Sequence, residues 1–192
     1  MQISWAELAQ QVSDCAACEL CEDCIQKVMG QGDPNAALML IGEGPGEQED
    51  KTGQAFVGRA GDLLTNMLKA IDLPRDRVYI CNTVKCRPPK NRAPKPDELE
   101  ACQPHLLAQI ALVKPKVIFL LGATAVRVML GPNYRITQCR GQWFERGDIK
   151  MMATFHPAAL LRDPRRKHDT WADLKLLRQE LQSLGAYADL LK

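Results

Sequence analysis

The sequence predicts an α/β protein in which a parallel sheet lies between helices. Four short apolar runs have the length of buried strands, and they cover residues 36–41, 78–81, 117–121 and 149–154. Segments with apolar residues at helical spacing alternate with these runs, which is typical of parallel sheets. The 192 residues contain no repeat, linker or low-complexity segment, so we expect one domain over residues 1–192.

Capping signals and apolar periodicity predict the helices, which are expected over residues 5–12, 60–71, 97–113, 123–130 and 170–184. Ser4, followed by Glu7 three residues later, is a capping-box pattern at the first helix start. Pro104 is expected to distort the third helix, because proline lacks a backbone N–H. Trp171 is expected on the apolar side of the last helix, in line with its leucines.

The composition, with 46% hydrophobic and 25% charged residues, is typical of a globular protein. The formal net charge of +2 provides no global field for nucleic acid, so any basic surface must be local. The first residues do not resemble a signal peptide, and no apolar run approaches the ~20 residues of a membrane span. We therefore expect a cytoplasmic protein without a membrane partner, in which disulfides are rare.

The eight cysteines are too many to be only small core residues. Six are candidate metal ligands: Cys15, Cys18, Cys21, Cys24, Cys86 and Cys102. Four thiolates suit a zinc ion or an iron–sulfur cluster, and spacing alone does not choose the metal or the four ligands. Cys81 is expected to be buried inside a strand, and Cys139 to be a surface or core residue.

Two loops are expected to face each other across one site. Residues 42–50 form an acidic, glycine-rich loop after the first strand, and residues 155–162 form a His-Pro loop after the fourth. Such loops converge at the carboxyl ends of parallel strands, where ligands bind. The acidic residues would repel phosphate. The glycines resemble a dinucleotide-binding fingerprint, but its last glycine is missing, which disfavours a nicotinamide or flavin site. The layout favours a small hydrolytic or base-processing pocket.

Three residues are candidates for contact with a ligand in this pocket. Phe56 can stack on a planar ligand, with a plug over the sheet edge as the alternative. Asn82 can read an amide-like edge with its paired donor and acceptor, or can form a turn. His156, as a neutral imidazole, can stabilise an oxyanion, or can be a structural histidine.

Two basic clusters, at residues 85–92 and 162–167, leave the carboxyl ends of strands and would suit a phosphodiester backbone. A solvated charge run is the alternative for each cluster. Two such clusters beside one pocket favour the nucleic-acid interpretation.

Taken in order, these motifs resemble the family 4 uracil-DNA glycosylases of bacteria and archaea. The resemblance runs from about Cys15 to Trp171. It is carried by Cys15-x-x-Cys18, Gly42-Glu43-Gly44-Pro45-Gly46 with Glu49-Asp50, Phe56-Val57-Gly58, Asn82-Thr83-Val84-Lys85-Cys86-Arg87-Pro88-Pro89, Cys102, and His156-Pro157-Ala158 to Leu161-Arg162.

The resemblance implies a three-layer α/β/α sandwich around a central four-stranded parallel sheet. It implies a [4Fe–4S] cluster held by Cys15, Cys18, Cys86 and Cys102, with Cys21 and Cys24 extra to that pattern. The implied enzyme flips deoxyuridine out of DNA and hydrolyses its N-glycosidic bond, which releases uracil and leaves an abasic site. The implied partner is uracil-containing DNA, single- or double-stranded, met by a monomer; contact with a sliding clamp stays open.

The resemblance also assigns roles to single residues. The flipped base would stack on Phe56 and be read by Asn82, and His156 would donate to its O2 atom. Glu49 would crowd the C5 position and reject the methyl group of thymine. Gly44 stands where other glycosylase families have an aspartate, so Glu43 is the nearest candidate to orient water or stabilise the sugar cation.

Four further residues are expected to contact DNA. Leu160 would wedge into the gap that the flipped base leaves, and Arg162, Lys85 and Arg87 would hold phosphates. Three alternatives have different consequences. An iron–sulfur electron carrier would not excise uracil, a covalent relative would need a histidine in the loop at residues 90–94, and a zinc hydrolase would be colourless.

Overall fold

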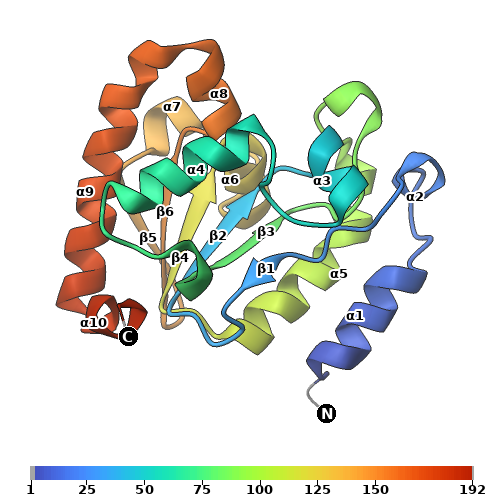
Figure 1. Cartoon of the computed structure of the whole chain (residues 1–192), viewed down its shortest axis with the longest axis horizontal. Helices are drawn as coiled ribbons and strands as arrows, with labels where there is room; N and C mark the ends of the chain where they lie inside the picture. The colour runs from blue at the N-terminus through green and yellow to red at the C-terminus, as the bar shows by residue number, and fades with distance from the viewer. Residues whose placement is uncertain (1–2, 192) are drawn as a thin grey trace.

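The computed structural model describes residues 3–191, which form a six-stranded mixed sheet between two layers of helices (Figure 1). The strand order is β1-β3-β2-β4-β6-β5. The strands are β1 (Gln31–Gly32), β2 (Leu38–Gly42), β3 (Tyr79–Asn82), β4 (Val117–Leu121), β5 (Trp143–Arg146) and β6 (Ile149–Thr154). Strands β2, β3, β4 and β6 pair in parallel, whereas β1 and β5 pair antiparallel at the two edges.

The predicted α/β class is confirmed, but the sheet has six strands instead of the expected four. Strand β1 contains only two residues, and β5 ends in the exposed residues Glu145 and Arg146. Neither edge strand has the apolar run of a buried strand, so the sequence pattern did not reveal them.

The α-helices are α1 (Trp5–Asp14), α2 (Leu20–Asp23), α3 (Glu47–Thr52), α4 (Arg59–Lys69), α5 (Pro96–Val113), α6 (Ala123–Met129), α7 (Ile136–Cys139), α8 (Pro157–Arg162), α9 (Lys167–Ser183) and α10 (Ala186–Leu190). Short 3₁₀ helices are η1 (Arg75–Arg77), η2 (Pro89–Asn91) and η3 (Pro164–Arg166). The capping box is confirmed, since the Ser4 hydroxyl accepts from the backbone N–H of Glu7 and the Glu7 carboxylate accepts from that of Ser4. Helix α5 continues through Pro104.

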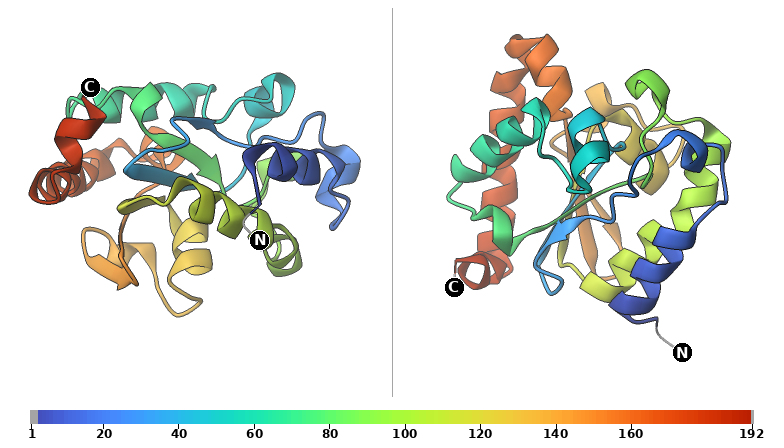
Figure 2. Two further views of the ribbon diagram at one scale, coloured as in Figure 1. Left: turned by 90° about the horizontal axis from the view of Figure 1, so that it is seen from below. Right: turned by 45° about the vertical axis from the view of Figure 1, so that its right-hand side comes forward.

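The two faces of the sheet bury different side chains, because successive residues of a strand point to opposite sides. On one face, Leu38 and Leu40 of β2 pack with side chains of α4, α9 and α10. On the other face, Met39 and Ile41 pack with side chains of α5, α6 and α7. The view from below shows the two helical layers on either side of the strands (Figure 2).

Helix α9 differs in one respect from the sequence expectation. The predicted apolar side included Trp171, but its side chain is exposed. Thr170 takes the buried place one turn before Leu174, because residues four apart share a helix face. None of the helices in residues 3–191 is long and apolar enough to cross a membrane.

Candidate active site and cysteine pocket

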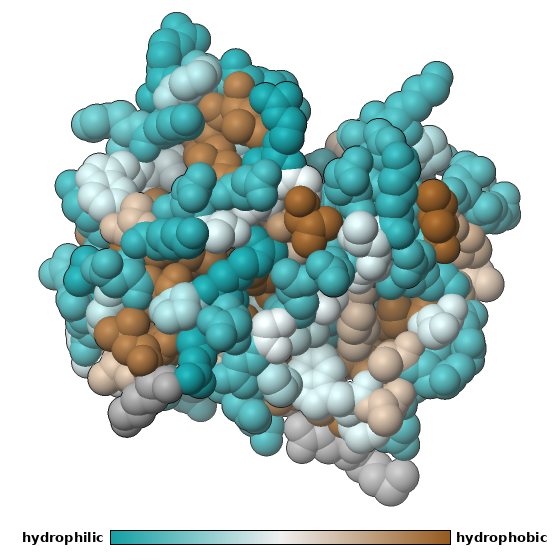
Figure 3. All heavy atoms as spheres, in the orientation of Figure 1, coloured by the Kyte–Doolittle hydropathy of each residue, from teal (hydrophilic) through white to brown (hydrophobic). Residues whose placement is uncertain are grey.

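A pocket opens where the four parallel strands end, and each strand contributes to its lining. Glu43 follows β2, Asn82 ends β3, Gly122 follows β4 and His156 follows β6. The glycine-rich loop, including Gly44, and the His-Pro loop therefore face one site, as the sequence predicted. The space-filling view shows a notch between two mainly hydrophilic lobes at this end of the molecule (Figure 3).

The ring of Phe56 is held in this pocket by an unusual backbone and by its neighbours. Phe56 has a φ of 53°, and the Arg75 guanidinium donates to its carbonyl oxygen at 2.8 Å. The ring centroid lies 5.6 Å from that of the His156 imidazole. A Cβ atom at Gly42 would lie 2.5 Å from both the Phe56 ring and the Asn82 Oδ1 atom. Glycine at this position therefore allows the ring and the amide to pack together.

The amide of Asn82 is buried and keeps an unused acceptor. Its side chain is 1% exposed, and within residues 3–191 its Oδ1 atom has no hydrogen-bond partner. Buried polar atoms without partners are rare, because each costs free energy. An unpaired amide oxygen in a pocket lining is suited to a ligand that offers an N–H group.

His156 is presented to the pocket in a defined tautomer. It caps α8, and its Nδ1 atom accepts a hydrogen bond of 3.1 Å from the backbone N–H of Ala158. The pKa of His156 is lowered to about 4, mainly by burial and also by the positive charge of Arg162, while the charge of Glu49 acts in the opposite direction. The imidazole is therefore neutral near pH 7, with its proton on Nε2 as a donor.

The two glutamates of the glycine-rich loop have different surroundings. The Glu43 carboxylate accepts a short hydrogen bond from the Thr124 hydroxyl. The carboxylate of Glu49, by contrast, accepts from the backbone N–H groups of Val57 and Gly58, both at 2.9 Å, and of Gly46 at 3.1 Å. Glu49 lines the pocket and also joins the two loops that form its wall.

Asp50, in the first turn of α3, is buried although it is an acidic residue at a helix start. Its Oδ1 atom accepts from the backbone N–H groups of Ile25 and Gln26, at 2.9 and 3.3 Å. These contacts connect the glycine-rich loop to the segment that follows the cysteine run.

Two of the residues expected to contact DNA are buried in this structure. Lys85 is 2% exposed, and its Nζ atom donates to the Asn82 carbonyl and to the Gln109 side chain instead of facing solvent. Leu160 is 1% exposed and packs in the hydrophobic core, whereas the next residue, Leu161, is 37% exposed on α8. The sequence alone does not show which basic residue of the loop is buried. It also does not show which of the two adjacent leucines is buried.

The other two expected DNA-contacting residues lie closer to the surface. Arg162 is exposed at the rim of the pocket, beside Arg166. Arg87 is partly buried, and its Nε atom donates to the Asn91 side chain at 2.8 Å. The lining therefore includes Arg162 and Arg166 on the His-Pro side, whereas Arg87 lies in the loop after β3, next to the lining residue Pro88.

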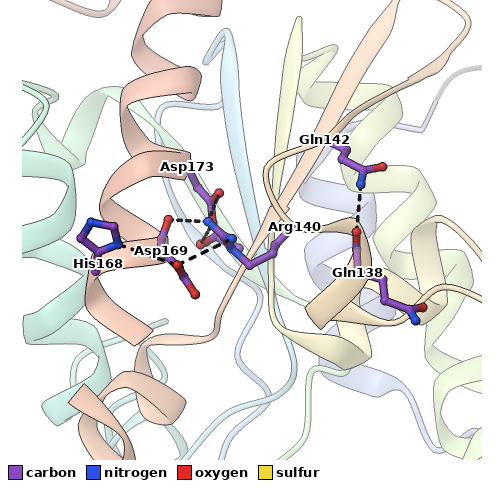
Figure 4. Close-up of polar contacts among 7 residues, drawn as sticks. Gln138, Arg140, Gln142, His168, Asp169 and Asp173 are labelled. Carbon is purple, nitrogen blue, oxygen red and sulfur yellow. Dashed lines mark hydrogen bonds and ion pairs between the residues drawn. The ribbon is translucent and has the colours of Figure 1, made fainter. Parts of the chain in front are cut away.

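Asp173 of α9 joins this helix both to Arg140, which follows α7, and to the strand that leads to His156 (Figure 4). The Arg140 guanidinium donates to both Asp173 carboxylate oxygens, at 3.0 and 2.7 Å, and to the Asp169 carbonyl at 2.6 Å. Asp173 also accepts from the Thr154 hydroxyl at 2.6 Å, two residues before His156. Burial raises the pKa of Asp173, while the bonds from Thr154 and Arg140 oppose that rise. The sequence analysis did not identify this support.

A second pocket gathers the cysteines between α1, α2 and α5. Five of them line it: Cys15, Cys18, Cys21, Cys86 and Cys102. Burial raises the pKa of Cys86, and the neighbouring Cys24 thiol raises it further. Cys81 and Cys139 are buried in the core on the α5 face of the sheet. All eight thiols are free of disulfides.

The thiols of this pocket do not surround a single point. Among the described residues, no three metal-binding side chains meet closely enough to hold one metal ion. The donor set itself, several thiols beside one pocket, suits an iron–sulfur cluster or a zinc ion. It is compatible with a cubane cluster, in which each thiolate binds a different iron atom.

The chain combines an α/β sheet, a pocket at the carboxyl ends of its parallel strands and a second pocket lined by cysteines. The family model of the uracil DNA glycosylase superfamily matches residues 29–175. The chain belongs to this superfamily, since the match covers most of its length.

Curated relatives carry the same family assignment. A type-4 uracil-DNA glycosylase of Thermotoga maritima is 48% identical over 160 residues, which are 81% of this chain and 82% of the relative. The type-4 enzyme of Sulfurisphaera tokodaii is 42% identical and covers 92% of this chain and 84% of its own length. That of Archaeoglobus fulgidus is 36% identical, with 88% and 89% covered.

Proposed function

We propose that this protein is a type-4 uracil-DNA glycosylase, a repair enzyme that removes uracil from DNA. It takes deoxyuridine out of the base stack, breaks the bond between uracil N1 and the sugar C1′ atom, and joins water to C1′. The products are free uracil and an abasic site. The observation that carries this proposal is the buried Asn82 amide, which lies in one pocket with the Phe56 ring and the neutral His156.

The pocket recognises uracil by shape and by one edge of the ring. The base stacks on Phe56 and lies against the backbone of Gly44. Asn82 accepts from the uracil N3–H group with its unpaired Oδ1 atom and donates to O4 with its amide nitrogen. Cytosine presents the opposite pattern and leaves two buried groups mismatched. Glu49 forms part of the wall that excludes a methyl group at C5.

His156 acts on the leaving base. When the glycosidic bond breaks, the bonding electrons stay with uracil, and negative charge builds on its O2 atom. The neutral imidazole donates its Nε2 proton in a hydrogen bond to this oxygen. A neutral donor already in place needs no protonation step near pH 7.

Glu43 is the proposed group on the sugar side of the bond. Its carboxylate is held by the Thr124 hydroxyl, so one oxygen is oriented and the other remains for water or for the positively charged sugar. Gly44 provides no carboxylate, which leaves this role to its neighbour.

The DNA duplex meets the rim of the pocket. Arg162 and Arg166, which line the pocket, bind phosphates on the His-Pro side. Arg87, in the loop after β3, binds a phosphate beside the pocket. Leu161, rather than Leu160, is the wedge that fills the space left by the flipped base, because it is the exposed leucine of α8. The enzyme is proposed to act as a monomer.

The cysteine pocket holds a [4Fe–4S] cluster. Its proposed ligands are Cys15, Cys18, Cys86 and Cys102, which all line the pocket. Cys86 is a fixed point for the loop that carries Arg87, so the cluster stabilises part of the DNA-binding rim. Cys21 also lines the pocket and Cys24 lies beside Cys86, but neither is needed to complete the four ligands.

Product analysis tests the proposed function. Protein purified without oxygen should be brown, contain about four iron atoms per chain, and release free uracil from a synthetic strand with one deoxyuridine. Matched strands with thymine or cytosine at that position are the controls. An electron carrier would be brown but would release no base, and a zinc hydrolase would contain no iron.

A further inference from the structure

Lys85 is a charged side chain that is only 2% exposed, and no step of the proposed reaction uses it. Its Nζ atom donates to the Asn82 carbonyl at 2.7 Å and to the Gln109 Oε1 atom at 2.6 Å. Gln109 is itself buried, and its Nε2 atom donates to the Met29 carbonyl at 2.6 Å and to the Tyr79 hydroxyl at 2.9 Å. The lysine thus ends in a fixed network of neutral acceptors.

The positive charge of Lys85 has no carboxylate partner in residues 3–191. A buried ammonium is costly unless an opposite charge balances it. On its other side Lys85 lines the cysteine pocket, next to Cys86 in sequence. Cys86 and Cys102, two of the proposed ligands, line the same pocket as Lys85.

We propose that Lys85 is a positioning residue that couples the thiolate site to the uracil reader. The negative charge of the sulfur ligands balances its ammonium, and the ammonium fixes the Asn82 carbonyl and therefore the depth of the Asn82 amide. This inference rests on the proposed function, in which thiolates hold a cluster and Asn82 reads uracil. It gives the cluster an effect on base recognition in addition to its effect on the DNA-binding loop.

The substitution Lys85→Met tests the coupling, because methionine keeps an unbranched side chain but removes the charge and the donors. The matched control is Lys27→Met. Lys27 also lines the cysteine pocket, but its Nζ atom donates to the Ser13 carbonyl at 2.6 Å and not to Asn82. Any general effect of one lost cation beside the thiols appears in both variants.

Two measurements distinguish positioning from mere structural support. The first is iron per chain, together with the rate of cluster loss in air. The second is affinity for two DNA ligands: a strand with 2′-fluorinated deoxyuridine, which resists hydrolysis, and a strand with an abasic site. Only the first of these ligands contains a base that Asn82 can read.

We expect Lys85→Met to bind fluorinated uracil-DNA roughly 10- to 100-fold more weakly, the loss of one or two buried hydrogen bonds. Its affinity for abasic DNA should stay within about twofold, and its iron content should fall or its cluster should decay faster. Lys27→Met should match the wild type in all three. The proposal would be overturned if Lys85→Met lost the same affinity for both DNA ligands. It would also be overturned if Lys85→Met had the same affinities and iron content as Lys27→Met.

A second variant keeps the test decisive if Lys85→Met does not fold. Gln109→Met removes one acceptor from Lys85 and touches neither the thiols nor the DNA. It should keep its iron and lose affinity for fluorinated uracil-DNA alone, by about 3- to 10-fold; unchanged affinity contradicts the coupling. If the wild type itself lacks iron or releases no uracil, the proposed function fails first, and the inference fails with it.

Discussion

The Nδ1 atom of His156 accepts a hydrogen bond from the backbone N–H of Ala158, two residues further along the chain. This contact forms because His156 caps α8, where backbone N–H groups lack helical partners. A protonated imidazole has no acceptor, so protonation would break the bond. The start of the helix and the burial of the ring together keep His156 neutral.

The neutral state of His156 predicts a specific pH dependence of stability. Its pKa is about 4 in the folded protein, against an ordinary value near 6.5 in the unfolded chain. Between these values the unfolded chain binds a proton that the folded protein does not. Acidification from pH 6.5 to pH 4 should therefore lower the free energy of unfolding, by up to about 3 kcal/mol from this residue.

Chemical denaturation of the wild type and of His156→Gln across this range measures the effect. The stability difference between the two proteins should change between pH 6.5 and 4 and be constant above pH 7. Uracil excision should likewise show no step near pH 6.5. A step there would mean that the imidazole becomes charged in the folded protein at that pH.

Asn82→Asp should abolish most uracil excision. The substitution replaces the amide donor with an acceptor, opposite an O4 atom that also accepts. We expect the single-turnover rate to fall by a factor on the order of 10²–10⁴. Weak excision of cytosine is the expected gain, since a carboxylate accepts from its amino group. A variant that excises uracil at the wild-type rate would remove Asn82 from base recognition.

Adjacent leucines should respond in opposite ways to replacement by alanine. Leu161→Ala should keep the melting temperature but slow uracil excision from duplex DNA roughly tenfold, with a smaller effect on single strands. Leu160→Ala should lose on the order of 2–5 kcal/mol of stability, because it leaves a cavity in the core. If Leu161→Ala acts equally on both kinds of DNA, this side chain is not the wedge.

Glu49→Ala should destabilise the wall of the pocket. It leaves three backbone N–H groups without their acceptor, at a cost on the order of 3 kcal/mol or more. A lower melting temperature and slower uracil excision are the expected results. Glu47→Ala is the matched control, because Glu47 is exposed and pairs only with surface cations. An unchanged melting temperature together with new thymine excision would instead make Glu49 a pure selectivity residue.

Replacement of single cysteines should separate ligands from neighbours. Cys86→Ala and Cys102→Ala should lose most of the iron and weaken DNA binding, since three thiolates hold a cluster poorly. Cys24→Ala should retain full iron, as a control from the same run of cysteines. Iron lost in Cys24→Ala but kept in Cys15→Ala would change the set of ligands.

The core of the fold was predictable because burial leaves a pattern in sequence. The predicted strand at 117–121 matches β4, and the predicted strand at 149–154 matches β6. Edge strand β5 was missed because its outer residues are polar, and α8 because six residues that begin with proline show no helical period. Trp171 was predicted to be buried but is exposed, because helical spacing alone does not decide whether Thr170 or Trp171 lies on the buried face of α9.

The pocket was predictable where residues lie at strand ends. Phe56, Asn82 and His156 meet in the structure as the parallel topology implies. The inward turn of Lys85 was not predictable, since its acceptor Gln109 lies 24 positions away. Arg75 reaches Phe56 from 19 positions away and likewise leaves no local signal. Such contacts depend on how the helices pack on the sheet.

The central claim is that this pocket excises uracil with His156 acting on the leaving base. Single-turnover rates and binding constants for His156→Ala on uracil-DNA test it most directly. The account predicts that the rate at saturation falls by about 10²–10³ while affinity for uracil-DNA changes little, because the donor matters mainly once negative charge has formed. A variant that binds uracil-DNA far more weakly, yet cleaves it at the normal rate once saturated, would contradict the claim.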